Sequence, residues 1–130
     1  MARPTDYTIA SDMHSRLATH LHGRYLTSNT YLSDPRRFLG SPFRRFTTTQ
    51  GRKVLALGMM FDFTLAANGV EVQKMKDFVE EEWFLKEVRK DVDAVLLVGH
   101  IPVRLMYMAY IRLINRFRHH GKNGEHFIQR

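Results

Sequence analysis

One histidine, His100, follows a predicted strand at a position where α/β proteins place catalytic and ligand-binding groups. Residues 92–98 form a largely apolar run, and Gly99 and His100 follow it directly. A run this short and apolar is typical of a strand covered on both faces, as in the centre of a parallel sheet. Ligands gather at the carboxyl ends of such strands, so the imidazole of His100 is a candidate ligand for a divalent metal. The alternative is a structural histidine in the loop after the strand.

A second pair with metal-ligand chemistry, Asp12 and His14, has one residue between its members. Asp-x-His supplies ligands in many metal-dependent enzymes. However, apolar residues recur every four positions over 9–21, which predicts a helix over residues 7–22. Side chains two positions apart on a helix point about 200° away from each other. We therefore do not expect Asp12 and His14 to close on one ion.

A third feature combines cations with aromatic rings between residues 36 and 46. Its cations are Arg36, Arg37, Arg44 and Arg45. Arginines interleaved with phenylalanines can contact phosphates and stack on bases, which makes an anion-binding or nucleic-acid-binding site one hypothesis. The other hypothesis is a strand with its phenylalanines inward and its arginines outward.

The net charge fits an anionic partner without identifying it. The 130 residues include 20 Lys and Arg against 13 Asp and Glu, for a net charge of +7. The acidic residues concentrate between 66 and 103, so both flanks are basic. Nucleic acid, an anionic surface and a phosphorylated substrate all remain open as partners. With 44% hydrophobic residues, residues 1–130 are expected to fold as a single domain.

Several classes of protein are excluded by composition and motif. The chain has no cysteine, which rules out a disulfide scaffold, a thiolate zinc site and a cysteine nucleophile. It contains no glycine-rich phosphate loop and no local signature of a nucleophilic triad. Its apolar runs, such as 94–98, are far short of the ~20 residues that a membrane helix needs. No apolar signal segment follows Met1, so the default expectation is a cytoplasmic location.

The pattern of apolar and turn residues predicts strands that alternate with helices, an α/β layered fold. The helix from Asp77 is expected to bury Val79, Trp83, Phe84 and Val88, and the last helix Met106, Tyr110, Leu113 and Phe117. Residues 33–42 carry two prolines and a glycine and are expected to form a loop. The expected strands are 24–31, 43–49, 53–59, 70–72, 92–98 and 126–129, and the expected helices are 7–22, 77–90 and 104–118.

Four stretches together resemble one known family. They are Gly23–Asn29, Arg44–Thr64, Glu80–Phe84 and Val92–Arg104. The chain from about Tyr7 to Gln129 is similar to the middle of fungal 5′-nucleotidase-like proteins, a group of calcineurin-like metallophosphoesterases. The resemblance implies a partial layered α/β sandwich of the metallophosphoesterase type. It also implies hydrolysis of a phosphate ester or nucleotide with a pair of divalent metals, which would be Zn, Mn, Fe or Mg.

The ligand blocks of that family are mostly missing. Metal ligands there come from Asp-x-His, Gly-Asp-x-x-Asp, Gly-Asn-His-Asp/Glu, a lone Gly-His and Gly-His-x-His. Only the lone Gly-His is matched, by Gly99 and His100, since the sequence has no Gly-Asp and no Asn-His dipeptide. The resemblance therefore assigns a metal-ligand role to His100 alone. One ligand cannot hold two ions, so we expect this chain alone to be inactive.

Three hypotheses follow from the sequence. The first is a truncated metallophosphoesterase domain, related to proteins that are often secreted or vacuolar. The second is a non-catalytic basic module that binds nucleic acid or another polyanion. The third is a fragment that completes its sheet with a partner or by oligomerisation, because a sliced sheet exposes edge strands.

Overall fold

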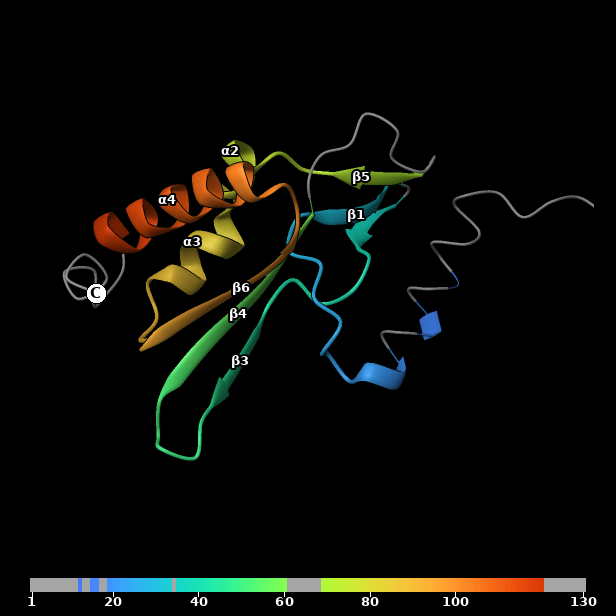
Figure 1. Ribbon diagram of the computed structural model, residues 1–130. Coiled ribbons are helices and arrows are strands. Elements are labelled where there is room, and N and C mark those ends of the chain that lie inside the picture. Colours follow the sequence, from blue (N-terminus) through green and yellow to red (C-terminus); the bar gives the residue numbers. More distant parts are fainter. Residues whose placement is uncertain (1–11, 13–14, 17–18, 34, 61–68, 121–130) are drawn as a thin grey trace, which may run out of the picture.

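The computed structural model describes residues 12, 15–16, 19–33, 35–60 and 69–120. They form two three-stranded sheets, and helices cover one face of the larger sheet (Figure 1). Residues 19–21 are helical, within the expected first helix, and Gly23 after them has a φ of 82°. The chain therefore has the expected α/β fold.

The smaller sheet has the order β2-β1-β5 and is antiparallel throughout. Its strands are β1 (Thr30–Ser33), β2 (Arg36–Phe38) and β5 (Val70–Val72). The expected loop over 33–42 is wrong, because β2 pairs with β1 in a register that sets Phe38 opposite Tyr31. Pro35 and Gly40 flank this short strand rather than interrupt it. A loop prediction based on their composition overlooks the three-residue strand that lies between them.

The larger sheet has the order β3-β4-β6. Its strands are β3 (Arg44–Thr47), β4 (Lys53–Met60) and β6 (Ala94–His100). The first two form the expected hairpin, whose turn includes Gly51 at a φ of 83°. β6 runs parallel to β4, as expected for the apolar run.

Coverage of β6 on both faces is not observed. Among the described strands, β6 pairs with β4 alone, so it forms an edge of the sheet. Leu96 and Val98 are 48% and 57% exposed, whereas Val95 and Leu97 on the other face pack against the core. The apolar run indicates burial on both sides, but the described part of the chain supplies a cover for only one of them.

The expected helix from Asp77 to Lys90 is two helices, α2 (Met75–Phe78) and α3 (Glu82–Val88). Glu81 is extended, with φ and ψ of −63° and 134°, and this breaks the helix. Asp77 therefore lies inside α2 instead of capping a helix. The break lets Phe78 at the end of α2 and Phe84 in α3 enter the same core.

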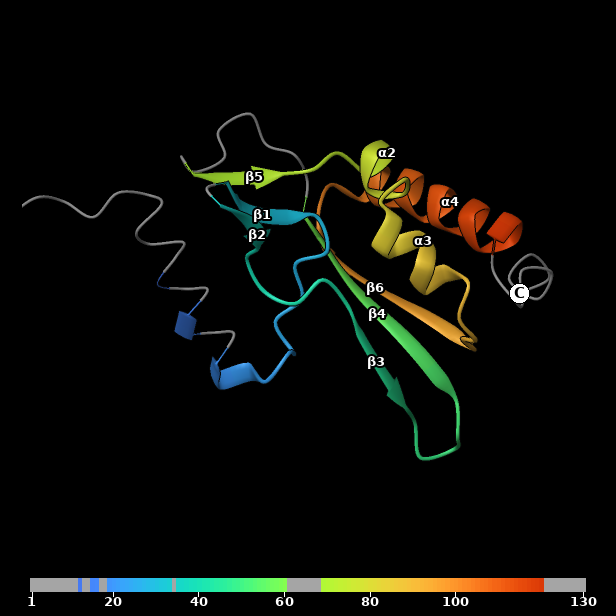
Figure 2. The same ribbon diagram turned by 180° about the vertical axis from the view of Figure 1, so that it is seen from behind.

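The main core lies between the larger sheet and the helices, which both views place on the same side of β4 and β6 (Figures 1 and 2). The last helix, α4, spans Val103–His120. Leu113 and Phe117 are buried as expected, but Tyr110 is half exposed and Ala109 takes the inward position. No described helix is long and apolar enough to cross a membrane.

The opposite face of β4 is crossed by the segment 26–28. The backbone N–H of Ser28 donates to the Gly58 carbonyl at 2.7 Å, and the Gly58 N–H donates to Ser28 Oγ at 3.0 Å. A Cβ on Gly58 would lie 2.4 Å from the Leu26 carbonyl oxygen. Glycine is therefore required for this close approach between the strand and the crossing segment.

Candidate functional site

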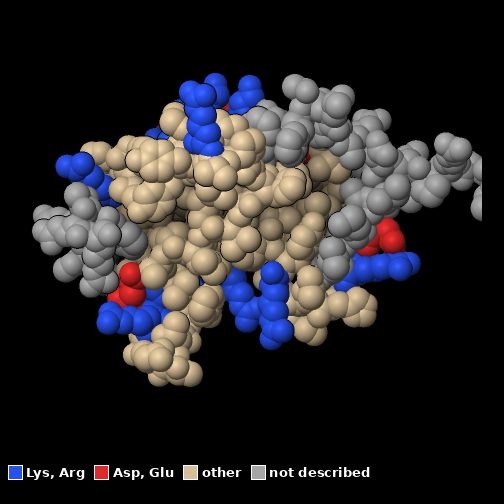
Figure 3. Space-filling view, viewed as in Figure 1, with Lys and Arg blue, Asp and Glu red and all other residues tan. Residues whose placement is uncertain are grey.

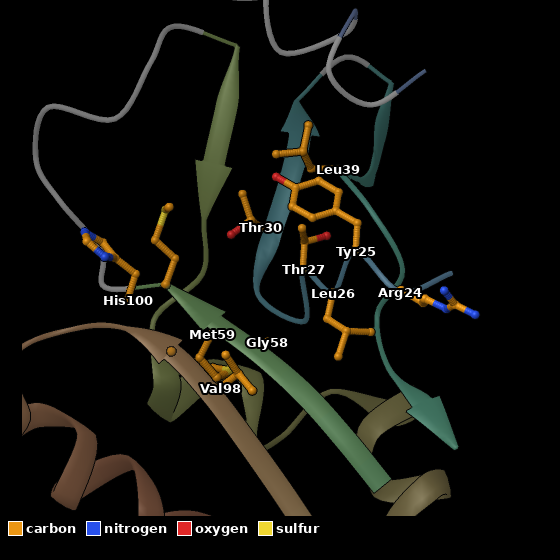
Figure 4. Close-up of a pocket in the computed structure, with 12 residues that line it drawn as sticks. Arg24, Tyr25, Leu26, Thr27, Thr30, Leu39, Gly58, Met59, Val98 and His100 are labelled. Carbon is orange, nitrogen blue, oxygen red and sulfur yellow. The ribbon is translucent and has the colours of Figure 1, made fainter. Parts of the chain in front are cut away.

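His100 is the last residue of β6 and lies opposite Met60 in the parallel register. It is one wall of a pocket of about 440 Å³. The ends of β4 and β6 form the floor of the pocket, and the segment from Arg24 to Thr27 forms another wall (Figure 4). The sequence-predicted position at the carboxyl end of a parallel strand is thus observed, and it opens on a pocket.

The pocket has a mainly apolar lining with a few polar groups. Two side chains of the lining carry ionisable nitrogen atoms, His100 and Arg24. They lie on opposite sides of the pocket in Figure 4. Tyr25 and Thr27 contribute hydroxyl groups between them. Burial raises the pKa of the Tyr25 phenol, so this hydroxyl stays neutral at ordinary pH. Neutral donors and basic groups therefore face the pocket, and no carboxylate of the described residues lines it.

This donor set does not fit a pair of metal ions. Within the described residues, no three His, Asp or Glu side chains come together as a possible metal site. Divalent metals need several ligands each to replace their water. His100 can supply one imidazole ligand. Its role as a metal ligand stays a prediction.

The second candidate pair is only partly described. Asp12 is exposed, and its carboxylate accepts a hydrogen bond from Arg16 Nε at 3.0 Å, one helical turn away. His14 lies outside the described residues. The metal-ligand role for Asp12 and His14 also stays a prediction.

The four candidate arginines lie on two different sheets. Arg36 and Arg37 belong to β2, and Arg44 and Arg45 belong to β3. Arg36 Nε is 3.5 Å from a Glu71 carboxylate oxygen, and its guanidinium stands 3.8 Å from the centre of the Tyr31 ring. Arg37 is exposed and Arg44 is partly buried.

Arg45 holds β3 against α3. Its Nε donates to the Glu87 carboxylate at 2.6 Å, and its Nη2 donates to the Glu87 carbonyl at 2.5 Å. Burial alone would raise the pKa of Glu87, but hydrogen bonds and charges from Lys90 and Arg45 outweigh it and lower that pKa. Two of the four arginines thus have carboxylate partners in the fold, and an anion-binding role for the set stays a prediction.

Sequence reasoning missed Asn29, which holds the carboxyl end of β4 through hydrogen bonds. Its Nδ2 donates to the Met60 carbonyl at 2.7 Å and to the Gln73 carbonyl at 2.9 Å. Its Oδ1 accepts from the Met60 N–H at 2.9 Å. Met60 is the register partner of His100, so this amide fixes the backbone beside the candidate ligand. The available signal was a run of four polar residues, 27–30, all of which are buried.

The fold places the chain in a structural class. Its mixed α/β arrangement, which includes a parallel pair of strands, is similar in overall fold to a solved structure. That structure is the crystal structure of 5′-nucleotidase from Candida albicans SC5314, with a TM-score of 0.74 and 25% identity. The match covers 87% of this chain and 22% of that chain. The fold is therefore 5′-nucleotidase-like.

Two relatives are similar in sequence. A protein of Arthroderma benhamiae named as a secreted protein is 41% identical over 87 residues, which cover 62% of this chain and 13% of the relative. An uncharacterised protein of Schizosaccharomyces pombe is 35% identical over 100 residues, or 74% of this chain and 17% of the relative. The match spans less than a fifth of either relative. No family model matches the chain.

These comparisons bear on two of the expectations. The expected resemblance to 5′-nucleotidase-like proteins holds at the level of the fold. The default expectation of a cytoplasmic location finds no support, since the relative from Arthroderma benhamiae is named as secreted.

Proposed function

We propose that this chain forms part of a phosphoesterase catalytic domain of the 5′-nucleotidase type. The observation that carries the proposal is the structural match, which takes in 87% of this chain but only 22% of the neighbour. The substrate class is a phosphate ester or nucleotide, and the parent protein acts outside the cell, as the name of the Arthroderma benhamiae relative suggests.

In this proposal His100 contributes one ligand to a site whose other ligands come from polypeptide beyond these 130 residues. Support comes from its place at the end of β6, where α/β sheets hold ligands. The amide of Asn29 keeps the neighbouring end of β4 in place through both backbone groups of Met60. Residues 19–120 then act as a scaffold for one corner of the site and hydrolyse nothing alone.

The first test measures hydrolysis of AMP and of p-nitrophenyl phosphate by the chain alone, with Mn²⁺ or Zn²⁺ added. No turnover is expected. If the chain hydrolyses either substrate and His100→Ala abolishes that hydrolysis, the proposed inactivity of the isolated chain is wrong. The proposed role of His100 as a metal ligand would then still hold.

The second test places the chain in a complete enzyme. Residues 19–120 replace the aligned segment of the Candida albicans 5′-nucleotidase, and His100→Ala is introduced into the chimera. We expect AMP hydrolysis by the chimera and a loss of about 100-fold or more in the variant, as for other metal-site groups. His119→Ala, an exposed histidine on α4, is the matched control and should leave the rate unchanged. A folded chimera that His100→Ala does not affect would refute the assignment.

A further inference from the structure

Helix α4 carries an apolar outer surface that the core does not use. Its inward row packs Ala109, Leu113 and Phe117 into the core. On the outside, Val103 is 87% exposed and Tyr107 is 65% exposed, and Met108 and Ile111 are also exposed. Large apolar side chains that gather on one exposed surface are typical of an interaction site.

Arginines stand between these apolar side chains. We define the α4 outer face as Val103, Arg104, Tyr107, Met108, Ile111 and Arg118. At 100° per residue these six positions fall within an arc of about 140° of the helix. Arg104 and Arg118 are exposed, and the sequence of α4 contains no Asp or Glu. Over α4 the surface in Figure 3 is mostly tan, with blue side chains at its upper and left margins.

One acidic neighbour of this helix, among the residues that the structure describes, is already in an ion pair. Glu80, in the turn after α2, forms an ion pair with Arg116, which lies outside the six positions of the face. Among the described residues no ion pair neutralises Arg104 or Arg118, so the α4 outer face keeps its positive charge there, in a chain whose net charge is +7. Charge complementarity calls for an anionic partner.

We propose that the α4 outer face binds the surface of an anionic lipid membrane. The headgroup region accepts both kinds of side chain, because guanidinium and phenol groups stay hydrated while their carbon atoms enter the acyl boundary. A polypeptide partner would have to bury arginines among the apolar contacts, at a cost in desolvation.

This proposal is independent of the proposed phosphoesterase role, since α4 packs on the sheet through its other side. The sequence hypothesis of a polyanion-binding module took in the basic residues from Arg104 to Arg118 as well as those from Arg36 to Arg45; the present proposal concerns α4 alone and names a lipid surface as the partner. The helix lies on the membrane in this proposal and does not span it, which agrees with the hydropathy of the described helices.

The test measures co-sedimentation of the full chain with vesicles of phosphatidylcholine, alone or mixed equally with phosphatidylserine. We expect binding to the mixed vesicles that weakens as salt is raised. The double variant Arg104→Gln and Arg118→Gln should bind the mixed vesicles about 25-fold more weakly, since each arginine near an anionic surface contributes a factor of about five. The control is the double variant Arg37→Gln and Arg52→Gln, which removes the same charge from exposed positions of a strand and a turn. Its effect on vesicle binding should be much smaller.

The apolar half of the face is tested separately. Tyr107→Ser with Ile111→Ser should weaken vesicle binding about tenfold or more at any salt concentration, through lost apolar contact. Leu96→Ser with Val98→Ser, exposed apolar residues of the sheet, is the control. A Tyr107→Trp variant places a second tryptophan, besides the one that the chain already has, on the α4 outer face. Its tryptophan fluorescence emission should shift to the blue when mixed vesicles are added.

Three outcomes would overturn the proposal. One is absence of binding to mixed vesicles, together with unshifted emission from the Tyr107→Trp variant. Another is an equal loss of binding in the control pairs, which would point to net charge or to general hydrophobicity. The third is binding to polyglutamate without binding to vesicles, which would identify the face as a surface for acidic polypeptides.

Discussion

At the scale of single residues, Asn29 joins three segments of the chain through one buried side chain. It is 1% exposed, and it bonds both backbone groups of Met60 at the end of β4 and the carbonyl of Gln73 after β5. Its own backbone carbonyl accepts a hydrogen bond from the Gln73 N–H at 2.8 Å. The larger and the smaller sheet are thus held together by this residue, next to His100.

We expect Asn29→Ala to lower the free energy of unfolding by about 3 kcal/mol. The change removes three hydrogen bonds made by a side chain that is 1% exposed, and each such bond contributes about 1 kcal/mol. Urea denaturation followed by circular dichroism measures the effect. Asn115→Ala, at an exposed position of α4, should change stability by less than about 0.5 kcal/mol. Equal effects of the two substitutions would contradict this role for Asn29.

Glu87 makes stability depend on acid pH. Its pKa in the folded chain is lowered from the ordinary value, so the unfolded chain binds the proton more tightly. The contribution of Glu87 is therefore fully present above the ordinary pKa of about 4.3 and is lost as the pH falls through the folded value. Thermal unfolding followed from neutral pH to below that ordinary pKa should show the corresponding fall in stability.

The matched variants for this prediction lie on the same helix. Glu87→Gln should flatten part of the acid dependence and lower stability at neutral pH by about 2 kcal/mol, since hydrogen bonds to charged groups are lost. Glu82→Gln, at an exposed position of α3, should keep the acid dependence of the unmodified chain. An unchanged pH profile in Glu87→Gln would show that other groups produce it.

At the scale of elements, the crossing of β4 by the segment 26–28 depends on Gly58. Because a Cβ there would meet backbone atoms of Leu26, the segment must move to admit any side chain. We expect Gly58→Ala to destabilise the fold by about 1–3 kcal/mol, the usual cost of overpacking. Differential scanning calorimetry measures it.

The control for Gly58 is a glycine required for a different reason. Gly51 has a φ of 83° in the open turn between β3 and β4, and a Cβ added there would meet no atom within 4 Å. Asparagine tolerates that conformation, so Gly51→Asn should cost less than about 1 kcal/mol. A Gly58→Ala variant as stable as Gly51→Asn would show that the crossing segment adapts freely.

Elements with strong local signals were predictable from sequence. The hairpin of β3 and β4 combines an apolar run in β4 with a glycine turn, and the apolar run of β6 predicts its parallel pairing correctly. Tertiary packing decided the rest. Glu81 takes an extended conformation so that Phe78 and Phe84 share one core, and no local pattern signals that break.

In the candidate site, too, local features were predictable from the sequence and long-range contacts were not. The position of His100 follows from the strand that precedes it, because the end of an apolar strand is a local feature. Asn29 becomes important through contacts with Met60 and Gln73, which lie 31 and 44 positions away in the sequence. Contacts of that range depend on the arrangement of both sheets, which a single sequence does not specify.

At the scale of the whole molecule, the larger sheet has one packed face and one open face. We define the open face by its exposed apolar residues, Phe46, Met60, Leu96 and Val98. The register places them on one side of the sheet, since Phe46 lies opposite Val54, Leu96 opposite Ala56, and Val98 opposite Gly58. Among the described residues, the segment 26–28 covers this side near Gly58. The open face and the edge strand β6 together offer a surface that another polypeptide layer can cover.

We expect the isolated chain to self-associate through this open face, as sedimentation velocity over a concentration series would show. The net charge of +7 opposes association, so it should strengthen when moderate salt screens that repulsion. Leu96→Thr with Val98→Thr keeps β-branched residues in the strand and removes apolar area, and should weaken association more than about tenfold. Leu105→Thr with Tyr110→Thr makes a comparable change on α4 and should have little effect if the sheet is the contact. A chain that stays monomeric at every concentration and salt would show that the open face is stable in water without a cover.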